Sequence, residues 1–288
     1  MLSTGTFGTA ILQVSQEEMF EHVLNDAVLG SSIYVNIALA GLALLLFMYM
    51  GRGVSDPRAK LIVVSAMAVS AVSIASYTGL ASGLTISVIE MPEGHALADN
   101  VVDLEGGGTA DGTVSLWGRY LTWAFSTPFI LIALGLLAES NVTKIFTAVI
   151  FDVGIMITGL AAALTTSSYA MRWVWYGISV SFFLVVVYIL LFEWPEDAAK
   201  AGTQDIFNTL KLLTVVLWFG YTIWWGIGNE GLALIETTGI TSWGYSAFDV
   251  VAKYGFGFLV INYVVNNVET VSRGADYGAT SGGIPADD

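Results

Sequence analysis

The sequence has no cysteine and only two histidines, His22 and His95. The absence of cysteine excludes a disulfide framework and a thiol site. Two histidines are too few for a histidine-rich metal site; we interpret both as solvated or capping residues and predict no metal site. Basic residues are also scarce: 10 Lys and Arg stand against 24 Asp and Glu, a net charge of −14, which argues against nucleic acid as a partner.

Charged residues of both signs make up only 12% of the chain, whereas hydrophobic residues make up 55% and the mean hydropathy is +0.72. This composition is typical of an integral membrane protein surrounded by lipid. Most acidic residues lie outside the apolar segments, and acid-rich exposed surfaces suit high salt, where their repulsion is screened. We interpret this charge pattern as an indication of a halophilic source.

Seven apolar segments are each close to the roughly 20 residues that a helix needs to cross a bilayer. We therefore predict an all-α membrane protein, a bundle of seven transmembrane helices in the cell membrane. The segments run over Ser31–Gly51, Ala59–Gly83, Leu116–Ala138, Lys144–Leu164, Trp173–Trp194, Ile206–Gly228 and Thr241–Val265.

The loops on one side of this bundle carry most of the basic residues, with Arg172 as the exception on the other side. The positive-inside rule then places the N-terminus outside and the C-terminus in the cytoplasm. We expect an extracellular segment over residues 1–30, a transmembrane domain over 31–267 and a disordered cytoplasmic tail over 268–288. The long extracellular loop, residues 84–115, is expected to contain a small strand at Leu84–Ile89 because polar and apolar residues alternate there.

Lys253 lies deep inside the last apolar segment, where a charged amine costs about 3 kcal/mol on insertion scales. Asp249 precedes it by four residues, so the two side chains share one helix face. One interpretation is a structural ion pair. The other is chemical, because a desolvated lysine amine readily forms a Schiff base with an aldehyde ligand.

The third segment carries a polar stripe, since Arg119, Thr122, Ser126 and Ala133 recur on one helical face. Hydroxyl groups in membrane helices often bond to their own backbone, which is the alternative for Thr122 and Ser126. An arginine at the end of the stripe favours an inward-facing polar site instead.

Aromatic residues mark three helices near mid-segment and can enclose a flat, elongated, apolar ligand together with two small residues on neighbouring segments. The aromatic residues are Trp123, Tyr176, Trp218, Tyr221 and Trp225, and the small ones are Gly159 and Ser179. Core packing alone is the alternative for any one of them.

Two further ionisable residues lie in the apolar segments. Asp152, midway along the fourth, is expected to be protonated and hydrogen-bonded, with a transport role as the alternative. Lys211, about one turn inside the sixth, is expected to extend its amine toward the membrane surface, with a contribution to an anion exit as the alternative.

These residues occur in motifs that resemble the microbial rhodopsins and, within them, the archaeal halorhodopsins. The resemblance covers about Glu18 to Asn267. Its motifs are Arg119-Tyr120-Leu121-Thr122-Trp123, Ser126-Thr127-Pro128, Thr158-Gly159-Leu160-Ala161-Ala162-Ala163, Trp218 with Tyr221, Asp249-Val250-Val251-Ala252-Lys253, and the loop Ile89-Glu90-Met91-Pro92-Glu93-Gly94-His95-Ala96.

The resemblance implies all-trans retinal bound as a protonated Schiff base on Lys253 and light-driven inward chloride transport. Proton-pumping relatives carry acids where Thr122 and Ala133 stand. One departure is Thr222, where relatives usually have proline. The resemblance also suggests a homotrimer in membrane lipid, and it allows an associated carotenoid that no residue pattern indicates.

The resemblance and the residue patterns together give two predicted sets. The retinal-binding set is Lys253, Asp249, Trp123, Thr127, Gly159, Tyr176, Ser179, Trp218, Tyr221 and Trp225. The chloride set is Arg119, Thr122, Ser126 and Asp249.

The buried charges favour an anion as cargo. A protonated Schiff base and Arg119 give two positive charges against one negative charge on Asp249, and an uncompensated buried charge is expensive. A bound halide removes the excess, and we expect a transporter, not an enzyme. A sensory photoreceptor of the same fold is the alternative function.

Overall fold

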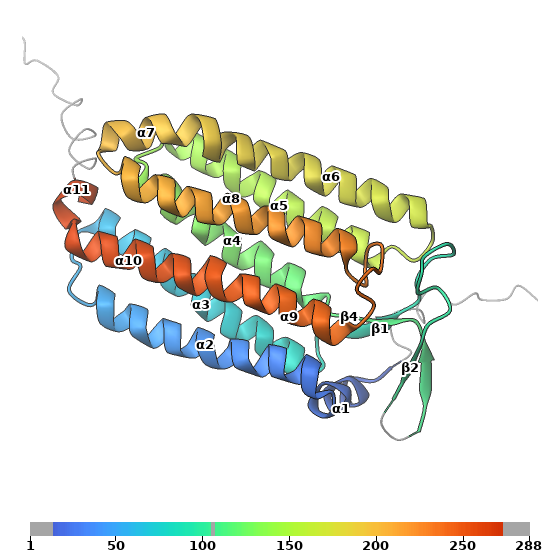
Figure 1. Cartoon of the computed structure of the whole chain (residues 1–288). Coiled ribbons are helices and arrows are strands. Elements are labelled where there is room, and N and C mark those ends of the chain that lie inside the picture. The colour runs from blue at the N-terminus through green and yellow to red at the C-terminus, as the bar shows by residue number, and fades with distance from the viewer. Residues whose placement is uncertain (1–13, 105–106, 273–288) are drawn as a thin grey trace, which may run out of the picture.

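The computed structural model describes residues 14–104 and 107–272 of the chain. Within them, seven helical spans are long and apolar enough to cross a membrane, which confirms the predicted seven-helix bundle. Figure 1 shows the spans lying side by side along one long axis. They are formed by α2 (Ala27–Gly51), α3 (Pro57–Ala81), α4 (Gly118–Leu137), α5 (Val142–Leu164), α6 (Tyr169–Tyr188) with η1 (Ile189–Glu193) and α7 (Trp194–Ala201), α8 (Gln204–Ile227), and α9 (Thr238–Asp249) with η2 (Val250–Gly255) and α10 (Phe256–Asn266).

Side-chain caps fix where several spans begin. Asp26, Asp56, Asn141 and Ser168 each accept a hydrogen bond from a backbone N–H in the first turn of α2, α3, α5 and α6, respectively. These N–H groups have no acceptor inside their own helix, so each capping side chain supplies a hydrogen bond that would otherwise be missing. The cap at Asp26 lets α2 begin several residues before the predicted start at Ser31.

Two spans contain a wider π-helical segment that the apolar pattern did not predict. The segment η1 joins α6 to α7 just before Pro195, whose ring cannot continue a regular helical hydrogen-bond ladder. The segment η2 interrupts the last span and contains Lys253. Single π turns inside α-helices are rare and are frequently found at functional sites.

One end of the bundle, here termed the capped end, is covered by the long loop and a short helix (Figure 1). The loop contains the antiparallel pairs β1 (Ser87–Ile89) with β4 (Thr113–Ser115) and β2 (Val101–Asp103) with β3 (Thr109–Asp111). The strand expected at Leu84–Ile89 is therefore present only over Ser87–Ile89, and the other three strands were not predicted.

The short helix α1 (Gln16–Asn25) lies in the predicted N-terminal segment and packs beside α2. Its first turn is closed by reciprocal hydrogen bonds between Ser15 and Glu18, and these bonds lower the pKa of the Glu18 carboxyl group.

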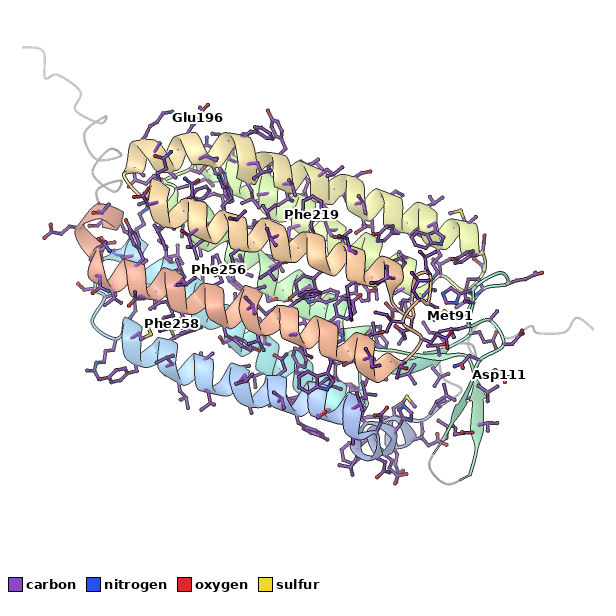
Figure 2. All side chains as sticks on the ribbon, in the orientation of Figure 1. Met91, Asp111, Glu196, Phe219, Phe256 and Phe258 are labelled. Carbon is purple, nitrogen blue, oxygen red and sulfur yellow. The ribbon has the colours of Figure 1, made fainter. Side chains whose placement is uncertain are left out.

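The outside of the bundle is apolar, as lipid requires. Figure 2 shows Phe219 and Phe258 on the outer surface and Phe256 among the helices, and their exposed fractions are 39%, 45% and 1%. At the end opposite the cap, Val268–Ser272 form α11 inside the segment expected to be a disordered tail, whereas residues 273–288 lie outside the described residues.

Candidate functional site

Lys253 lies in η2 with its side chain turned into the bundle and 2% of the residue exposed. Its Nζ donates to Asp249 Oδ2 at 2.9 Å, so the pairing predicted from the four-residue spacing is present. A lysine amine in this position is desolvated and held in one direction, which suits covalent attachment of an aldehyde.

Asp249 accepts hydrogen bonds from three aromatic side chains besides Lys253. Tyr77 Oη donates to Oδ2 at 2.7 Å, Tyr221 Oη to Oδ1 at 2.6 Å and Trp123 Nε1 to Oδ1 at 3.3 Å. Four donors fix both oxygens and offset the cost of burying a carboxylate. Tyr77 was not predicted. Its place one residue after Ser76 and four residues after Ser73, near the end of a helix with several buried serines, was the available signal.

A cavity lies beside Lys253 and is lined by side chains from α4, α5, α6, α8 and η2. Nine of the ten residues predicted to bind the cofactor line it, and the tenth, Asp249, contacts Lys253. The residues that line the cavity but were not predicted are Tyr120, Ile130, Ile155, Met156, Val180, Phe183, Thr222 and Ala252. The lining is largely aromatic and aliphatic, which fits an apolar ligand.

Aromatic rings give this cavity flat walls. Tyr176 and Trp225 are stacked, with ring centroids 4.7 Å apart and an interplanar angle of 14°. Small Gly159 keeps space open on α5, because a Cβ there would come within 3.3 Å of the Tyr120 ring. Flat walls separated by small residues favour a planar, elongated ligand.

Thr222 lies in an unbroken helix, α8. Its hydroxyl donates to Trp218 O at 3.0 Å, and its carbonyl accepts from Tyr176 Oη at 3.0 Å. Threonine therefore preserves a regular helix at the position where a proline would remove one backbone hydrogen bond.

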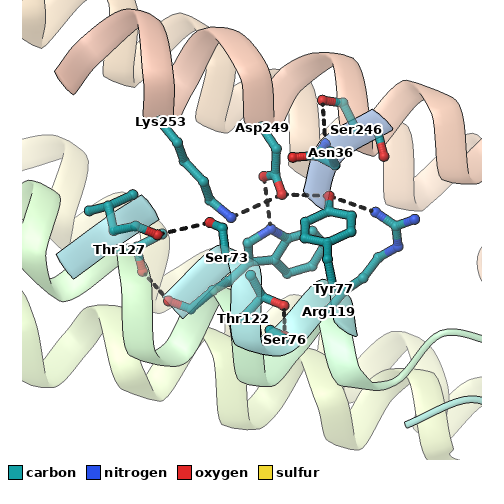
Figure 3. Close-up of polar contacts among 12 residues, drawn as sticks. Asn36, Ser73, Ser76, Tyr77, Arg119, Thr122, Thr127, Ser246, Asp249 and Lys253 are labelled. Atoms are coloured by element: carbon teal, nitrogen blue, oxygen red, sulfur yellow. Dashed lines mark hydrogen bonds and ion pairs between the residues drawn. The ribbon is translucent and has the colours of Figure 1, made fainter. Parts of the chain in front are cut away.

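Arg119 is 4% exposed and has no carboxylate partner among the described residues, whose ion pairs are Lys144–Asp197 and Lys253–Asp249. Its Nη1 donates to Tyr77 Oη at 3.4 Å, and its Nη2 donates to the hydroxyl and carbonyl oxygens of Ser242. Figure 3 shows Lys253, Asp249, Tyr77 and Arg119 joined in one row.

The two hydroxyl residues of the predicted stripe are buried on the same helix as Arg119. Thr122 Oγ1 donates back to Gly118 O at 3.1 Å, as the alternative anticipated, and also contacts Ser76 Oγ. Ser126 Oγ is buried and has no hydrogen-bond partner in the part of the chain that the structure describes. A buried hydroxyl without a partner is costly, so Ser126 has a donor available for a bound group.

Residues 27–267 match the bacteriorhodopsin-like protein family. The chain belongs to the bacteriorhodopsin-like protein family. Among its curated relatives in this family, the halorhodopsin of Natronomonas pharaonis is 62% identical over 276 residues, which is 96% of this chain and 94% of the relative. The halorhodopsin of Halobacterium sp. (strain SG1) is 59% identical over 284 residues, 98% of this chain and 96% of the relative.

Two solved structures are similar to this chain in fold. One described as "Halorhodopsin, a light-driven chloride pump" has 51% sequence identity and a TM-score of 0.80, covering 86% of this chain and 99% of that one. A light-driven proton pump from Leptosphaeria maculans, at 24% identity and a TM-score of 0.72, shares the fold. With seven spans and this family, the protein is a multi-pass protein of the cell membrane.

The residues present fit the retinal and chloride that the resemblance to halorhodopsins implies. Lys253 supplies the amine, and the aromatic cavity beside it supplies an apolar slot. Arg119 supplies a cation without a carboxylate partner in the described chain, and Ser126 supplies a free donor.

Three other positions bear on transport in this bacteriorhodopsin-like protein. Asp152 is fully buried, and its Oδ2 accepts from Thr127 Oγ1 at 2.6 Å, which agrees with the expected hydrogen bond. Ala133 is fully buried among apolar residues and supplies no acid. Lys211 Nζ donates to Asn208 Oδ1 at 2.8 Å near one end of α8.

Proposed function

We propose that the protein is a light-driven chloride pump that carries the anion inward, with retinal attached to Lys253 and the halide held by Arg119, Thr122 and Ser126. The observation that carries this proposal is the buried Arg119 guanidinium, which has neutral hydrogen-bond partners and no carboxylate partner among the described residues.

The charge balance explains why an anion is favoured. The nitrogen of Lys253 and the guanidinium of Arg119 carry two positive charges, and Asp249 between them carries one negative charge. Burying an ion without a compensating charge costs on the order of several kcal/mol. A halide near the Thr122 and Ser126 hydroxyl groups balances the site and gives the unpartnered Ser126 donor an acceptor.

The chain's own residues define what moves. When bound, retinal would supply a light-driven isomerisation, which would turn the N–H dipole at Lys253 away from its resting direction. Asp249 is tied by Tyr77, Tyr221 and Trp123, so the carboxylate stays in place while the N–H dipole turns. An anion attracted to that dipole follows it past the site, and Ala133 offers no acid for a competing proton cycle.

Relatives support this function over the sensory alternative. The two curated relatives described above are halorhodopsins, and one similar structure, at 51% identity, is described as a light-driven chloride pump. Retinal linkage through Lys253, inward direction, a homotrimer and an associated carotenoid stay predictions of the family resemblance. The predicted orientation, with the N-terminus outside, also stays a prediction.

The test has two parts, a spectral titration of the purified protein and a measurement of light-induced pH change in cells. The protein is purified with retinal, and its visible spectrum is recorded while chloride is titrated. We expect a chloride-dependent shift of the visible band, and no band at all in Lys253→Ala. In illuminated cells we expect passive proton uptake that a protonophore enhances. Acidification of the medium that a protonophore abolishes would identify a proton pump and contradict the proposal.

A further inference from the structure

Arg119 is held in place by neutral groups that come mainly from α9. Ser242 provides two acceptors, its hydroxyl oxygen and its carbonyl oxygen, the latter 3.4 Å from Arg119 Nη2. The ring of Tyr245 lies one turn further along α9, with its centroid 5.4 Å from the guanidinium carbon. The guanidinium is therefore oriented without being neutralised, and its charge remains available to an anion.

Ser242 belongs to a line of buried polar contacts between α2 and the last span, here termed the α2–α9 seam. Its members are Ser32, Asn36, Ser242, Ser246 and Tyr254, and each is buried. Ser246 Oγ donates to Ser32 O at 2.9 Å, Asn36 Nδ2 donates to Ser246 O at 3.1 Å, and Tyr254 Oη donates to Asn36 Oδ1 at 2.6 Å. Figure 3 shows Asn36 and Ser246 directly beside the Asp249–Tyr77–Arg119 row.

The direction of the hydrogen bonds in this seam follows from the groups involved. An arginine is only a donor, so the hydroxyl of Ser242 must accept from it. The hydrogen of Ser242 then points to Ser32 Oγ, and Ser32 in turn donates to Leu29 O at 2.7 Å. The hydroxyl groups of Ser242 and Ser32 each have one hydrogen, and each hydrogen is used in one of these bonds. The hydrogen bonds from Arg119 through Ser242 and Ser32 to α2 therefore have one consistent direction.

We infer that Ser242, backed by Ser32, is a positioning residue for Arg119 and thereby sets the affinity of the halide site. The inference rests on the proposed function, because it assigns Ser242 a role in the same anion site. Ser242 acts by holding the guanidinium in one orientation through Nη2, whereas Tyr77 contacts Nη1. Ser32 acts one step further back, by giving the Ser242 hydrogen a fixed acceptor.

A purely structural role for the seam predicts something different. Small residues let α2 and α9 approach closely, and serine in that role is replaceable by alanine with an effect on stability alone. The two roles separate because anion affinity and thermal stability are measured independently. The chain also offers a matched control, since Ser31 and Trp243 form the neighbouring α2–α9 contact, Trp243 Nε1 to Ser31 Oγ at 3.2 Å, on the exposed side.

The experiment uses the retinal-loaded protein and compares Ser242→Ala, Ser32→Ala and Ser31→Ala. The measured quantity is the chloride midpoint of the visible shift, with the thermal transition recorded in parallel. Loss of a charge-assisted hydrogen bond predicts an increase of about tenfold in the midpoint for Ser242→Ala. We expect about twofold to threefold for Ser32→Ala, which removes a neutral hydrogen bond. Ser31→Ala should leave the midpoint unchanged, and Ser242→Thr, which retains the hydroxyl, should restore most of the affinity.

An unchanged midpoint in Ser242→Ala overturns the inference, whatever happens to the thermal transition. If Ser242→Ala gives no folded pigment, Ser32→Ala decides, and an unchanged midpoint there overturns it too. An equal increase in Ser31→Ala also overturns it, because any loosening of the α2–α9 contact would then suffice. Absence of a chloride shift in the unmutated protein is a separate outcome, since it removes the proposed function itself.

Discussion

Two buried arginines, Arg119 and Arg172, differ in what surrounds them. Neither has a carboxylate partner among the described residues. Arg172 is fully buried, and its Nε and Nη1 donate to backbone carbonyl groups, Glu230 O at 2.7 Å and Thr165 O at 3.0 Å. Arg119 instead donates to Tyr77 Oη and to two oxygens of Ser242 inside the bundle, and it lies on the same helix as Ser126, whose Oγ has no partner among the described residues.

The difference indicates that Arg172 has a structural role, whereas Arg119 can bind a ligand. Arg172 joins the end of α5 to the loop after α8, so its hydrogen bonds hold the polypeptide at the capped end. This explains the exception to the positive-inside pattern, because Arg172 is a buried structural residue and not a surface charge. Arg119 donates to the hydroxyl groups of Tyr77 and Ser242 and to one carbonyl, that of Ser242, so its hydrogen bonds can rearrange largely through side chains when a ligand binds.

The largest effect is expected when a carboxylate is introduced near Arg119, because Arg119 would then have the acidic partner that it lacks among the described residues. Thr122→Asp introduces a negative charge on the same helical face, and it competes with a halide for the same positive field. We expect the chloride-dependent shift to disappear, an affinity loss of at least about 100-fold. Some light-driven proton release should appear, with a slow cycle because Ala133 gives no internal donor. The measurements are a chloride titration of the spectrum and light-induced pH change, with Thr122→Asn as the uncharged control. Undiminished chloride affinity would contradict the proposed site.

Removing each arginine in turn sharpens the comparison. Arg119→Gln should raise the chloride midpoint about 100-fold, because truncating one member of a buried charge pair costs about 2–5 kcal/mol. The midpoint is read from the spectral titration. If the shift persists at an unchanged midpoint, the anion binds elsewhere.

Arg172→Gln should act on stability. We expect the loss of two charge-assisted hydrogen bonds to lower the free energy of unfolding by about 2 kcal/mol, net of the reduced cost of burying a charge. The chloride midpoint should stay within about twofold of its original value. Thermal unfolding in detergent and the spectral titration test the two parts, and a large midpoint change with unchanged stability would reverse the roles of the two arginines.

The smallest expected effect concerns His95, in the loop at the capped end. Burial, and then the positive charge of Arg172, lower the pKa of His95 below its usual value of 6.5. The other groups facing its ring are Tyr169, with ring centroids 5.5 Å apart, and the backbone carbonyls of Glu230 and Gly231.

Since the folded protein disfavours the protonated ring, the unfolded chain binds the extra proton more readily. The His95 contribution to stability is therefore present above the unfolded pKa and is lost as the pH falls through and below about 6.5. The thermal transition should decrease between about pH 7.5 and pH 5.5, and His95→Gln should flatten this decrease. A His22→Gln variant is the control, and an equal slope in His95→Gln and the unmutated protein would contradict the assignment.

Much of the fold and the centre of the site could be predicted because their signals are local in sequence. Apolar runs fix the spans, and the four-residue spacing of Asp249 and Lys253 places both on one helix face. The contacts that were missed join helices far apart in sequence. Tyr77 reaches Asp249 across 172 positions and Ser32 reaches Ser242 across 210, and no periodicity along one helix indicates which residue of another faces it.

Tyr120 shows a second limit of sequence reasoning. It lies next to Arg119 in the sequence, on a different helical face from the polar stripe. No pattern other than the Arg119–Trp123 motif indicated it. In the structure its hydroxyl donates to Glu230 Oε2 at 2.7 Å and accepts from Trp225 Nε1 at 2.7 Å, while its ring lines the cavity. The strands β2–β4 were missed because runs of three residues are too short for an alternating pattern to be distinguished.

The π-helical segment η2 has a consequence at the level of the gene. A wider turn accommodates one more residue than an α-helix of the same length, and each α-helical residue turns the chain by about 100°. Removing a single codon within residues 250–255 would let the span close into a regular helix, and α9 and α10 would keep their relative phase, because the wider turn spreads the rotation of an α-helical turn over one more residue. A one-codon deletion between Asp249 and Lys253 would thus shorten their spacing from four residues to three, whereas the side chains from α10 onward would keep their directions.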